Sequence, residues 1–265
     1  MNLEKITGQV ISLCQNNAAY IRQQLELLKA KDIELKDEHN FVTYVDRKSE
    51  EMLVEALSRL LPGSGFIAEE GKYGQLGADF KWVIDPLDGT TNFIHGVPIF
   101  SISIALMKEE RIILGVVHEI NRSESYYSWQ GSKAFLNGKE IRVSSAGSLY
   151  DSLLVTGFPY YRDDILDRYV DLFKGFIKKT QDLRRLGSAA ADLAFVASGR
   201  FEGFYEIGLS PWDVAAGAFL VKQAGGMVTD FHGGDDYIFG KSLVSSNGLV
   251  HQEMLEVVQE YFNDK

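Results

Sequence analysis

The 265-residue chain contains one cysteine, few prolines and no long hydrophobic run. The single cysteine, Cys14, excludes an internal disulfide, and no histidine pairs obviously with a serine or with this cysteine, which argues against a covalent hydrolase. The longest apolar stretch, Pro98 to Met107, is too short and too rich in serine to cross a bilayer. Residues Met1 to Lys5 do not resemble the start of a signal peptide. We therefore expect a soluble, cytoplasmic protein that does not bind membranes.

Positive charge is also scarce, with 27 Lys and Arg against 37 Asp and Glu and a net charge of −10. General binding to nucleic acid needs clustered Lys and Arg, so the composition argues against it. The hydrophobic fraction of 45% and the charged fraction of 24% are ordinary for a globular protein. The chain is long enough for one large domain or two closely packed ones.

Hydrophobic periodicity predicts an α+β first half, residues 1–147. Apolar residues recur at helical spacing over 3–29 and 46–61. Apolar, β-rich runs predict strands, and the turn Lys108 to Glu110 predicts an antiparallel hairpin between two of them. The predicted strands are 81–85, 99–107, 111–118 and 126–129.

The pattern changes after about residue 148, and helical and strand-like segments then alternate. This alternation predicts a mixed α/β layer for the second half, residues 148–265. We expect the functional site between the two halves. The predicted elements are 153–156, 164–178, 189–198, 203–206, 212–224, 243–245 and 249–262.

The segment Trp82 to Phe93 runs from an apolar strand directly into two aspartates, Asp85 and Asp88. Pro86 lacks an N–H group and is expected to end the strand, while Gly89 lets the backbone approach a bound group closely. The aspartates then lie at the exit of the strand. Alternatively, Asp-Pro and Asp-Gly are common turn formers whose carboxylates simply face water.

The next residues, Thr90, Thr91 and Asn92, suit the start of a helix. The unpaired N–H groups and the positive dipole end of a helix favour a phosphate oxyanion. The stretch thus combines ligands for a cation with a site for an anion.

Two other segments carry carboxylates after apolar or small residues. Glu69 and Glu70 follow a short apolar run, and Asp213 begins an apolar, small-residue stretch that predicts a helix packed closely on a sheet. Hard divalent ions such as Mg²⁺ prefer oxygen ligands of this kind. The ordinary alternatives are a solvated loop for the glutamates and a helix cap for Asp213.

Taken together, these motifs resemble those of the inositol monophosphatases, within the lithium-sensitive, magnesium-dependent phosphatases. The first signature is Asp85-Pro-Leu-Asp88-Gly-Thr90-Thr91, and the second is Trp212-Asp213-Val-Ala-Ala-Gly217 followed by Ala224-Gly-Gly226. Glu69-Glu70 and Phe41 to Asp46 also match. The resemblance covers nearly the whole chain. It implies a layered α-β-α-β-α sandwich, a homodimer and a phosphoric monoester hydrolase acting on inositol monophosphates.

The resemblance also implies a set of metal ligands. Glu69, Asp85 and the backbone carbonyl of Leu87 would bind a first Mg²⁺ ion, and Asp85, Asp88 and Asp213 would bind a second. A third, weaker ion would share Glu69 and be completed by water.

Further roles follow from the same resemblance. Asp46 and Thr90 would orient the attacking water, and Glu70 would support them. Lys36 aligns with a basic residue near the third ion, although an exposed lysine is the ordinary interpretation. The substrate would be bound by Gly89, Thr90, Thr91, Gly187, Ser188, Ala189 and Glu206.

The alcohol part of the substrate is expected at Gly187 to Asp192 and at Glu206. An ionised carboxylate such as Glu206 can accept hydrogen bonds from two neighbouring hydroxyls of a polyol or a ribose. A tightly packed helix start is the alternative for Gly187 to Asp192.

The stretch Gly71 to Phe80 is shorter than its counterpart in the vertebrate inositol enzymes, which leaves the site more open. We therefore expect bulkier phosphorylated polyols, sugars or nucleotides as substrates, such as fructose 1,6-bisphosphate or the 2′-phosphate of NADP. A second hypothesis is a non-catalytic interaction module, because some bacterial relatives bind the transcription machinery. The candidate contact region for this role is a basic cluster, Lys178, Lys179, Arg184 and Arg185.

Overall fold

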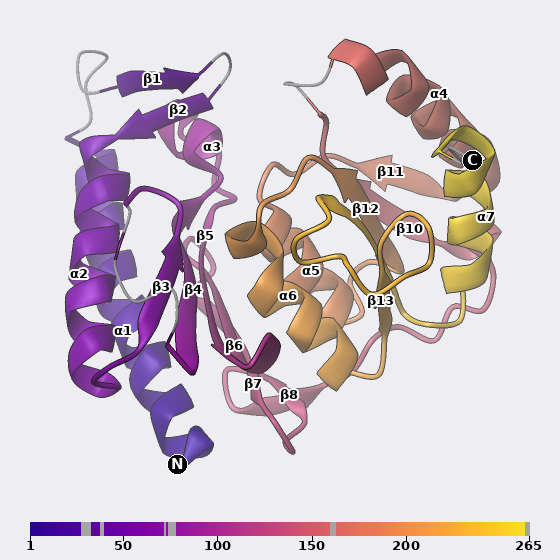
Figure 1. Ribbon diagram of the computed structural model, residues 1–265. Coiled ribbons are helices and arrows are strands. Elements are labelled where there is room, and N and C mark those ends of the chain that lie inside the picture. Colours follow the sequence, from indigo (N-terminus) through magenta and orange to yellow (C-terminus); the bar gives the residue numbers. More distant parts are fainter. Residues whose placement is uncertain (28–32, 38–39, 72, 74–77, 160–162, 263–265) are drawn as a thin grey trace.

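Helices and sheets alternate through the molecule in five layers (Figure 1). The computed structural model describes residues 1–27, 33–37, 40–71, 73, 78–159 and 163–262. The layers are a helix pair, a seven-stranded sheet, a second helix pair, a five-stranded sheet and a third helix pair. This order confirms the predicted α-β-α-β-α sandwich.

Helices α1 (Leu3–Leu25) and α2 (Tyr44–Leu60) cover the outer face of the seven-stranded sheet. The buried face of α1 repeats every three to four residues through Val10, Cys14, Ala18 and Ile21, as an amphipathic helix requires. The sheet is antiparallel except where β3 pairs with β4. In spatial order its strands are β3 (Gly65–Ala68), β4 (Phe80–Asp88), β5 (Ser101–Lys108), β6 (Arg111–Glu119), β7 (Glu124–Trp129), β8 (Ala134–Leu136) and β9 (Lys139–Ile141).

The five-stranded sheet of the second half is mixed, as predicted. Strand β10 runs parallel to β11 and β12, whereas β14 is antiparallel to β12 and β13. Helices α4 (Asp163–Lys179) and α7 (His251–Phe262) cover its outer face. In spatial order the strands are β11 (Asp182–Arg184), β10 (Leu153–Thr156), β12 (Gly203–Ile207), β14 (Ser242–Ser246) and β13 (Met227–Thr229).

Shorter elements in the described part of the chain connect these layers. A small antiparallel hairpin, β1 (Ile33–Asp37) and β2 (Asn40–Thr43), leads into α2 and was not predicted. A short helix, α3 (Thr90–His95), follows β4. A single 3₁₀ turn, η2 (Leu149–Asp151), precedes β10.

The central layer consists of α5 (Ala189–Ala197) and α6 (Pro211–Gln223), and every residue of α5 is buried. Small residues allow close packing here, because a Cβ atom on Gly217 would lie 2.5 Å from the Cβ of Leu193 in α5. A Cβ on Gly115 in β6 would lie 2.9 Å from the backbone oxygen of Ala216. Helix α6 therefore contacts both the other central helix and the first sheet, as its small residues predict.

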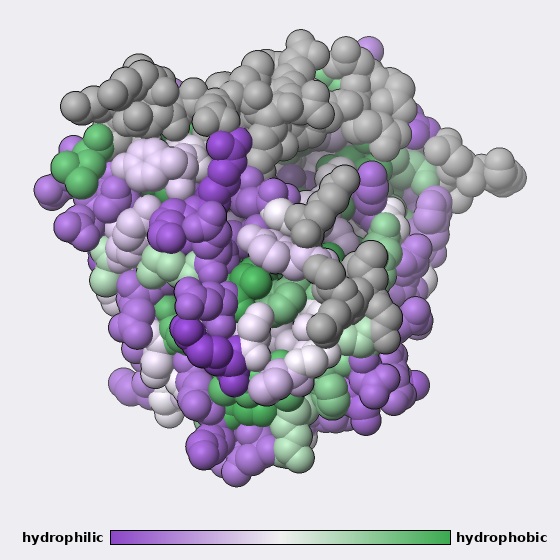
Figure 2. Space-filling view, turned by 60° about the vertical axis from the view of Figure 1, so that its left-hand side comes forward, coloured by the Kyte–Doolittle hydropathy of each residue, from purple (hydrophilic) through white to green (hydrophobic). Residues whose placement is uncertain are grey.

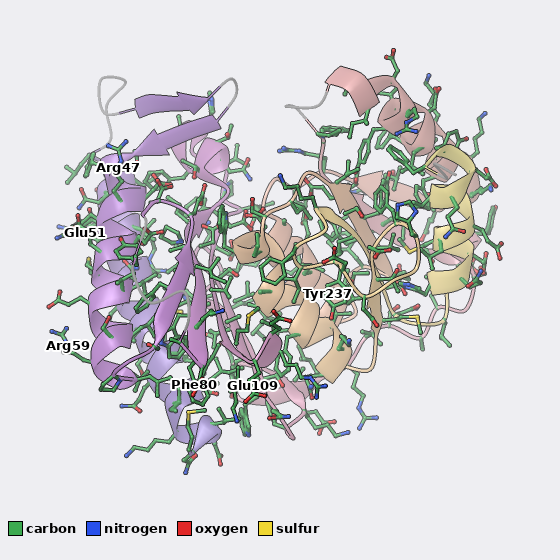
Figure 3. All side chains as sticks on the ribbon, in the orientation of Figure 1. Arg47, Glu51, Arg59, Phe80, Glu109 and Tyr237 are labelled. Atoms are coloured by element: carbon green, nitrogen blue, oxygen red, sulfur yellow. The ribbon has the colours of Figure 1, made fainter. Side chains whose placement is uncertain are left out.

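The outer surface is largely polar. Arg47, Glu51 and Arg59 lie along the outside of α2 (Figure 3), and exposed ion pairs join Glu51 to Lys48 and Arg59 to Glu55. Hydrophilic residues predominate on the face shown in Figure 2, with hydrophobic ones interspersed. No helix in the described part of the chain is long and apolar enough to span a membrane.

Candidate active site

Strand β4 delivers Asp85 and Asp88 to the junction of the two halves. The prediction that the strand ends at Pro86 is wrong. The strand continues to Asp88, with an irregular register between Asp85 and Asp88. The backbone N–H of Leu87 donates to Asp85 Oδ1 at 2.9 Å. This local turn bridges Pro86, whose missing N–H breaks the regular ladder, so the chain bulges and then resumes pairing.

Helix α3 begins at Thr90, which confirms the predicted helix start. Gly89 precedes it with a φ of 97°, in the left-handed region that glycine adopts without strain. A Cβ on Gly89 would lie 3.1 Å from the backbone oxygen of Gly187, which also has a positive φ. Two predicted substrate-binding glycines from different halves therefore lie side by side, while Thr91 is exposed.

Asp46 and Thr90 form a hydrogen-bonded pair, as the family resemblance implies. The Thr90 hydroxyl lies 2.8 Å from Asp46 Oδ1 and 3.1 Å from the carbonyl oxygen of Leu87. The hydroxyl and the N–H of Thr43 donate to the other oxygen of Asp46 in the capping box of α2. Burial raises the pKa of Asp46, and these hydrogen bonds oppose the rise.

Asp88 joins the first half to the start of α5. Its Oδ2 accepts from the Ser188 hydroxyl at 2.6 Å and from the N–H of Ala190 at 2.7 Å. The Ser188 hydroxyl also lies 3.0 Å from that of Ser101, which is buried in β5. The Ser188 hydroxyl therefore links Asp88 to Ser101, and its predicted contact with the substrate stays a prediction.

Asp213 caps α6, since its Oδ2 accepts from the N–H of Ser210 at 2.7 Å. Glu69 follows β3 and is close enough to raise the pKa values of Asp85 and Asp213. The N–H of Glu70 donates to Glu50, a fully buried carboxylate of α2 that the sequence did not single out.

The electrostatics of these carboxylates favour a bound cation. Burial first, and then the charges of Glu69, Asp88 and Asp213, raise the pKa of Asp85 well above its usual range. Burial raises the pKa of Asp88 to about 6, against the Ser188 hydrogen bond. A divalent cation would relieve this repulsion, and carboxylate and carbonyl oxygens are the ligands that Mg²⁺ prefers.

The donor set therefore fits magnesium in its chemistry. Within the described ranges, however, no group of three or more Asp, Glu, His or Cys side chains is already arranged to hold an ion. One oxygen each of Asp85, Asp88 and Asp213 is engaged by a backbone N–H group. Ion binding would use the remaining oxygens and the Leu87 carbonyl.

A cavity of about 380 Å³ opens beside Asp88 and Asp213. Gly187, Ser188, Ala189 and Glu206 line it, so the structure brings these predicted substrate residues together. Asp192, the last residue of the segment predicted to hold the alcohol, also lines it. Arg185 and Lys241 line it as well and were not predicted as site residues.

Three residues of the basic cluster have partners within the chain. The exposed Arg185 lines the cavity, with its guanidinium carbon 6.0 Å from the centre of the Phe158 ring. Arg184 forms an ion pair with Asp182, and Lys179 pairs with Glu260 at 2.9 Å.

The buried Glu206 makes the stability of the metal-free protein depend on pH. Burial raises the pKa of Glu206 from 4.5 to about 8. Between these values the folded state binds more protons than the unfolded state, so this group's contribution to stability is lost as pH rises. Glutamine does not titrate, so we expect Glu206→Gln to raise the free energy of unfolding by roughly 4 kcal/mol at pH 8 and by less than about 1 kcal/mol at pH 5.

Urea unfolding in EDTA at both pH values measures this difference. The exposed Asp171, which forms an ion pair with Lys174 on α4, supplies the control variant Asp171→Asn. If Glu206→Gln raised the free energy of unfolding equally at the two pH values, the raised pKa of Glu206 would be contradicted.

Two predicted features cannot be placed. The side chain of Lys36 lies outside the described residues, as does half of the 71–80 loop, of which residues 72 and 74–77 are not described.

Comparison with known proteins identifies the class. The inositol monophosphatase family model matches residues 2–263, so the chain belongs to the inositol monophosphatase family. The sequence is 42% identical to the Nus factor SuhB of Pseudomonas aeruginosa over 247 residues, which cover 91% of each chain. It is 43% identical to a fructose-1,6-bisphosphatase/inositol-1-monophosphatase of Thermotoga maritima, covering 83% of each.

Solved structures agree with this assignment. The Thermotoga maritima IMPase is similar with a TM-score of 0.89 and 37% identity over 97% of each chain. The extragenic suppressor protein suhB from Bartonella henselae gives a TM-score of 0.89 at 32% identity, over 95% of this chain and 97% of that one. The resemblance predicted from the motifs is confirmed.

Proposed function

We propose that this protein is a magnesium-dependent phosphomonoesterase that hydrolyses inositol monophosphates. The observation that carries the proposal is that Glu69, Asp88 and Asp213 lie close enough to Asp85 to raise its pKa, while Asp88 and Asp213 also line a cavity of about 380 Å³. Relatives named inositol-1-monophosphatase, one of them 38% identical over 229 residues, support the same activity.

Two to three Mg²⁺ ions would be held by these carboxylates. Glu69, Asp85 and the Leu87 carbonyl form the first ligand set, and Asp85, Asp88 and Asp213 form the second. Such ions neutralise phosphate charge and make water acidic enough to attack near neutral pH. We place a third, weaker ion at Glu69.

Thr90 and Asp46 position the attacking water. The Thr90 hydroxyl accepts a hydrogen bond from that water or takes part in moving its proton, while Asp46 holds the hydroxyl through the 2.8 Å contact. Thr43 in turn fixes Asp46 with two hydrogen bonds. Glu70 supports this arrangement through its backbone contact with Glu50.

The substrate lies across the junction of the halves. Its phosphate is held at Gly89, Thr90 and Thr91, where the first N–H groups of α3 have no partner within the helix. Its alcohol enters the cavity beside Gly187 and Ala189, where Glu206 accepts hydrogen bonds from ring hydroxyls. Ser188 contributes by orienting Asp88.

The substrate range extends beyond inositol phosphates. The relative from Thermotoga maritima carries both fructose-1,6-bisphosphatase and inositol-1-monophosphatase in its name. We therefore include fructose 1,6-bisphosphate and the 2′-phosphate of NADP among the candidate substrates.

Release of inorganic phosphate tests the proposal. The panel contains inositol 1-phosphate, fructose 1,6-bisphosphate, NADP and adenosine 3′,5′-bisphosphate, each with Mg²⁺, with EDTA and with added Li⁺. We expect turnover with Mg²⁺, loss of turnover in EDTA and inhibition by Li⁺. Folded protein that releases no phosphate from any of the four esters would refute the proposal.

A second candidate is a non-catalytic interaction module on the same scaffold, associated with transcription. Relatives 40–42% identical are named Nus factor SuhB, which supports it. As a phosphatase or as a module, the protein is proposed to act as a homodimer, the form implied by the family resemblance. Sedimentation at several protein concentrations measures this state.

A further inference from the structure

One face of α2 contacts three parts of the candidate site. Ser49 and Glu50 follow Asp46 by three and four residues, so the three side chains share the side of the helix that packs on β4 (Figure 1). Asp46 accepts from the Thr90 hydroxyl, and Glu50 accepts from the N–H of Glu70. Ser49 is fully buried beside them, and the proposed chemistry gives it no role.

Ser49 holds the irregular segment of β4. Its hydroxyl lies 3.1 Å from the carbonyl oxygen of Pro86 and donates to it. Pro86 and Leu87 have no paired residues in β5, because the register of β4 passes from Asp85 to Asp88. The hydrogen bond from Ser49 therefore takes the place of a ladder hydrogen bond that this segment lacks.

The peptide group between Pro86 and Leu87 couples Ser49 to Asp85. Its C=O group accepts from Ser49, and its N–H group, on Leu87, donates to Asp85 Oδ1 at 2.9 Å. A peptide group is planar and rigid, so a side chain that fixes its oxygen also fixes its N–H group. Ser49 thus orients the donor of the carboxylate that both proposed ligand sets share.

Asn17 of α1 fixes the direction of the Ser49 hydroxyl. Its Nδ2 lies 2.8 Å from Ser49 Oγ and 3.2 Å from the Ser49 carbonyl oxygen. An amide oxygen in this position would face that carbonyl oxygen, so the nitrogen belongs there. Because Nδ2 only donates, Ser49 Oγ accepts from it and directs its single proton to Pro86.

Stability alone does not explain Asn17. This residue is only 1% exposed, and its Oδ1 has no hydrogen-bond partner among the described residues. A buried acceptor without a partner destabilises the folded state. An apolar or small side chain would avoid this cost, as Cys14 and Ala18 do on the same face of α1. Side chains that break a rule of stability in this way are expected where function requires them.

We propose that Ser49, oriented by Asn17, is a positioning residue for the metal site. Ser49 keeps the Pro86–Leu87 peptide group in the conformation that orients Asp85 and presents the Leu87 carbonyl. Without this hydrogen bond the unpaired segment samples other conformations, and the apparent affinity for a cation falls with the fraction of competent molecules. The inference rests on the ligand set of the proposed function.

Binding of Mn²⁺ alone to the full chain tests the proposal, because Mn²⁺ takes the same carboxylate and carbonyl ligands as Mg²⁺. Loss of the free-ion EPR signal gives the dissociation constant without any substrate. We expect Ser49→Ala to weaken Mn²⁺ binding about tenfold, the lower end of the range for residues that orient metal ligands. Asn17→Leu leaves the Ser49 hydroxyl in place but unoriented, and it weakens binding by a smaller factor.

Two controls separate positioning from a general loss of stability. Ser12→Ala makes the same chemical change at an exposed position of α1. Val10→Ala removes buried volume from α1 and leaves the hydrogen bonds of Ser49 intact. Both variants should bind Mn²⁺ as the wild-type protein does.

The Mg²⁺ dependence of phosphate release gives a second measurement. In Ser49→Ala the Mg²⁺ concentration for half-maximal activity should rise about tenfold, in line with the weaker binding. At saturating Mg²⁺ its kcat should stay within about twofold of the wild-type value, because excess ion restores the competent conformation.

The outcomes separate the inference from the proposed function. Unchanged Mn²⁺ affinity in folded Ser49→Ala overturns the inference, as does equal weakening in Val10→Ala. If Ser49→Ala does not fold, wild-type affinity in Asn17→Leu overturns it instead. Wild-type protein that binds no Mn²⁺ refutes the ligand set and the inference together. Wild-type protein that binds Mn²⁺ but releases no phosphate refutes the phosphatase function alone.

Discussion

Asp88→Asn is expected to lower phosphatase kcat/KM by roughly 10³-fold or more while the protein remains folded, because the site loses one metal-binding charge. Asp88 Oδ2 accepts from the Ser188 hydroxyl and the N–H of Ala190. The amide oxygen of asparagine can accept the same two hydrogen bonds. Its NH₂ group then takes the place of the oxygen that would face the cation, and an amide N–H group cannot bind one.

Phosphate release from inositol 1-phosphate at saturating Mg²⁺, together with thermal unfolding, measures both effects. Asp171→Asn on the surface of α4 is the matched control, with the same change of charge outside the site. A fully active Asp88→Asn protein would contradict the site assignment. An interaction role does not need the metal-binding charge, so Asp88→Asn keeps partner binding if the protein acts as an interaction module, which distinguishes the two candidate functions.

Gly217→Ala is expected to destabilise the protein, although alanine is normally the better helix former. The new Cβ would lie 2.5 Å from the Cβ of the buried Leu193, so the α5 or α6 backbone must shift. Overpacking of this kind costs about 1–3 kcal/mol or more, against a gain of about 1 kcal/mol in helix propensity. We expect a net loss of roughly 2 kcal/mol, and a fall in activity because α6 carries Asp213.

Gly8→Ala provides a control with the same chemical change. Gly8 lies within α1, and a Cβ there would meet no atom within 4 Å. This variant should therefore gain up to about 1 kcal/mol. Urea unfolding of both variants gives the comparison, and a stabilised Gly217→Ala protein would show that the central layer is looser than described.

The sequence predicted most of the fold because its long elements carry a clear period. The bounds of β10 agree with the prediction, and those of α4 and α6 differ by one residue. Four strands of three residues, β8, β9, β11 and β13, were missed because so short a segment shows no alternation. Pro86 misled the prediction because a bulge lets an irregular strand continue past it.

The site was predictable where ligands follow one another in the chain and less so where folding brings them together. Asp85, Asp88 and Thr90 belong to a single strand-to-helix segment, so their proximity follows from the local motif. Lys241 reaches the cavity and Glu50 reaches Glu70 only because folding brings together residues far apart in the sequence, for which the linear pattern holds no signal. The metal and substrate roles of the predicted residues stay predictions.

The hydrogen bonds from Ser188 and Ala190 to Asp88 have an evolutionary consequence. The same carboxylate that would bind a cation also ties the first half of the chain to the start of α5. A descendant released from selection for catalysis would still be under selection for stability at this position. Retention of Asp88 in a non-catalytic relative is therefore compatible with a purely structural constraint, and only a measured activity distinguishes an enzyme from a former one.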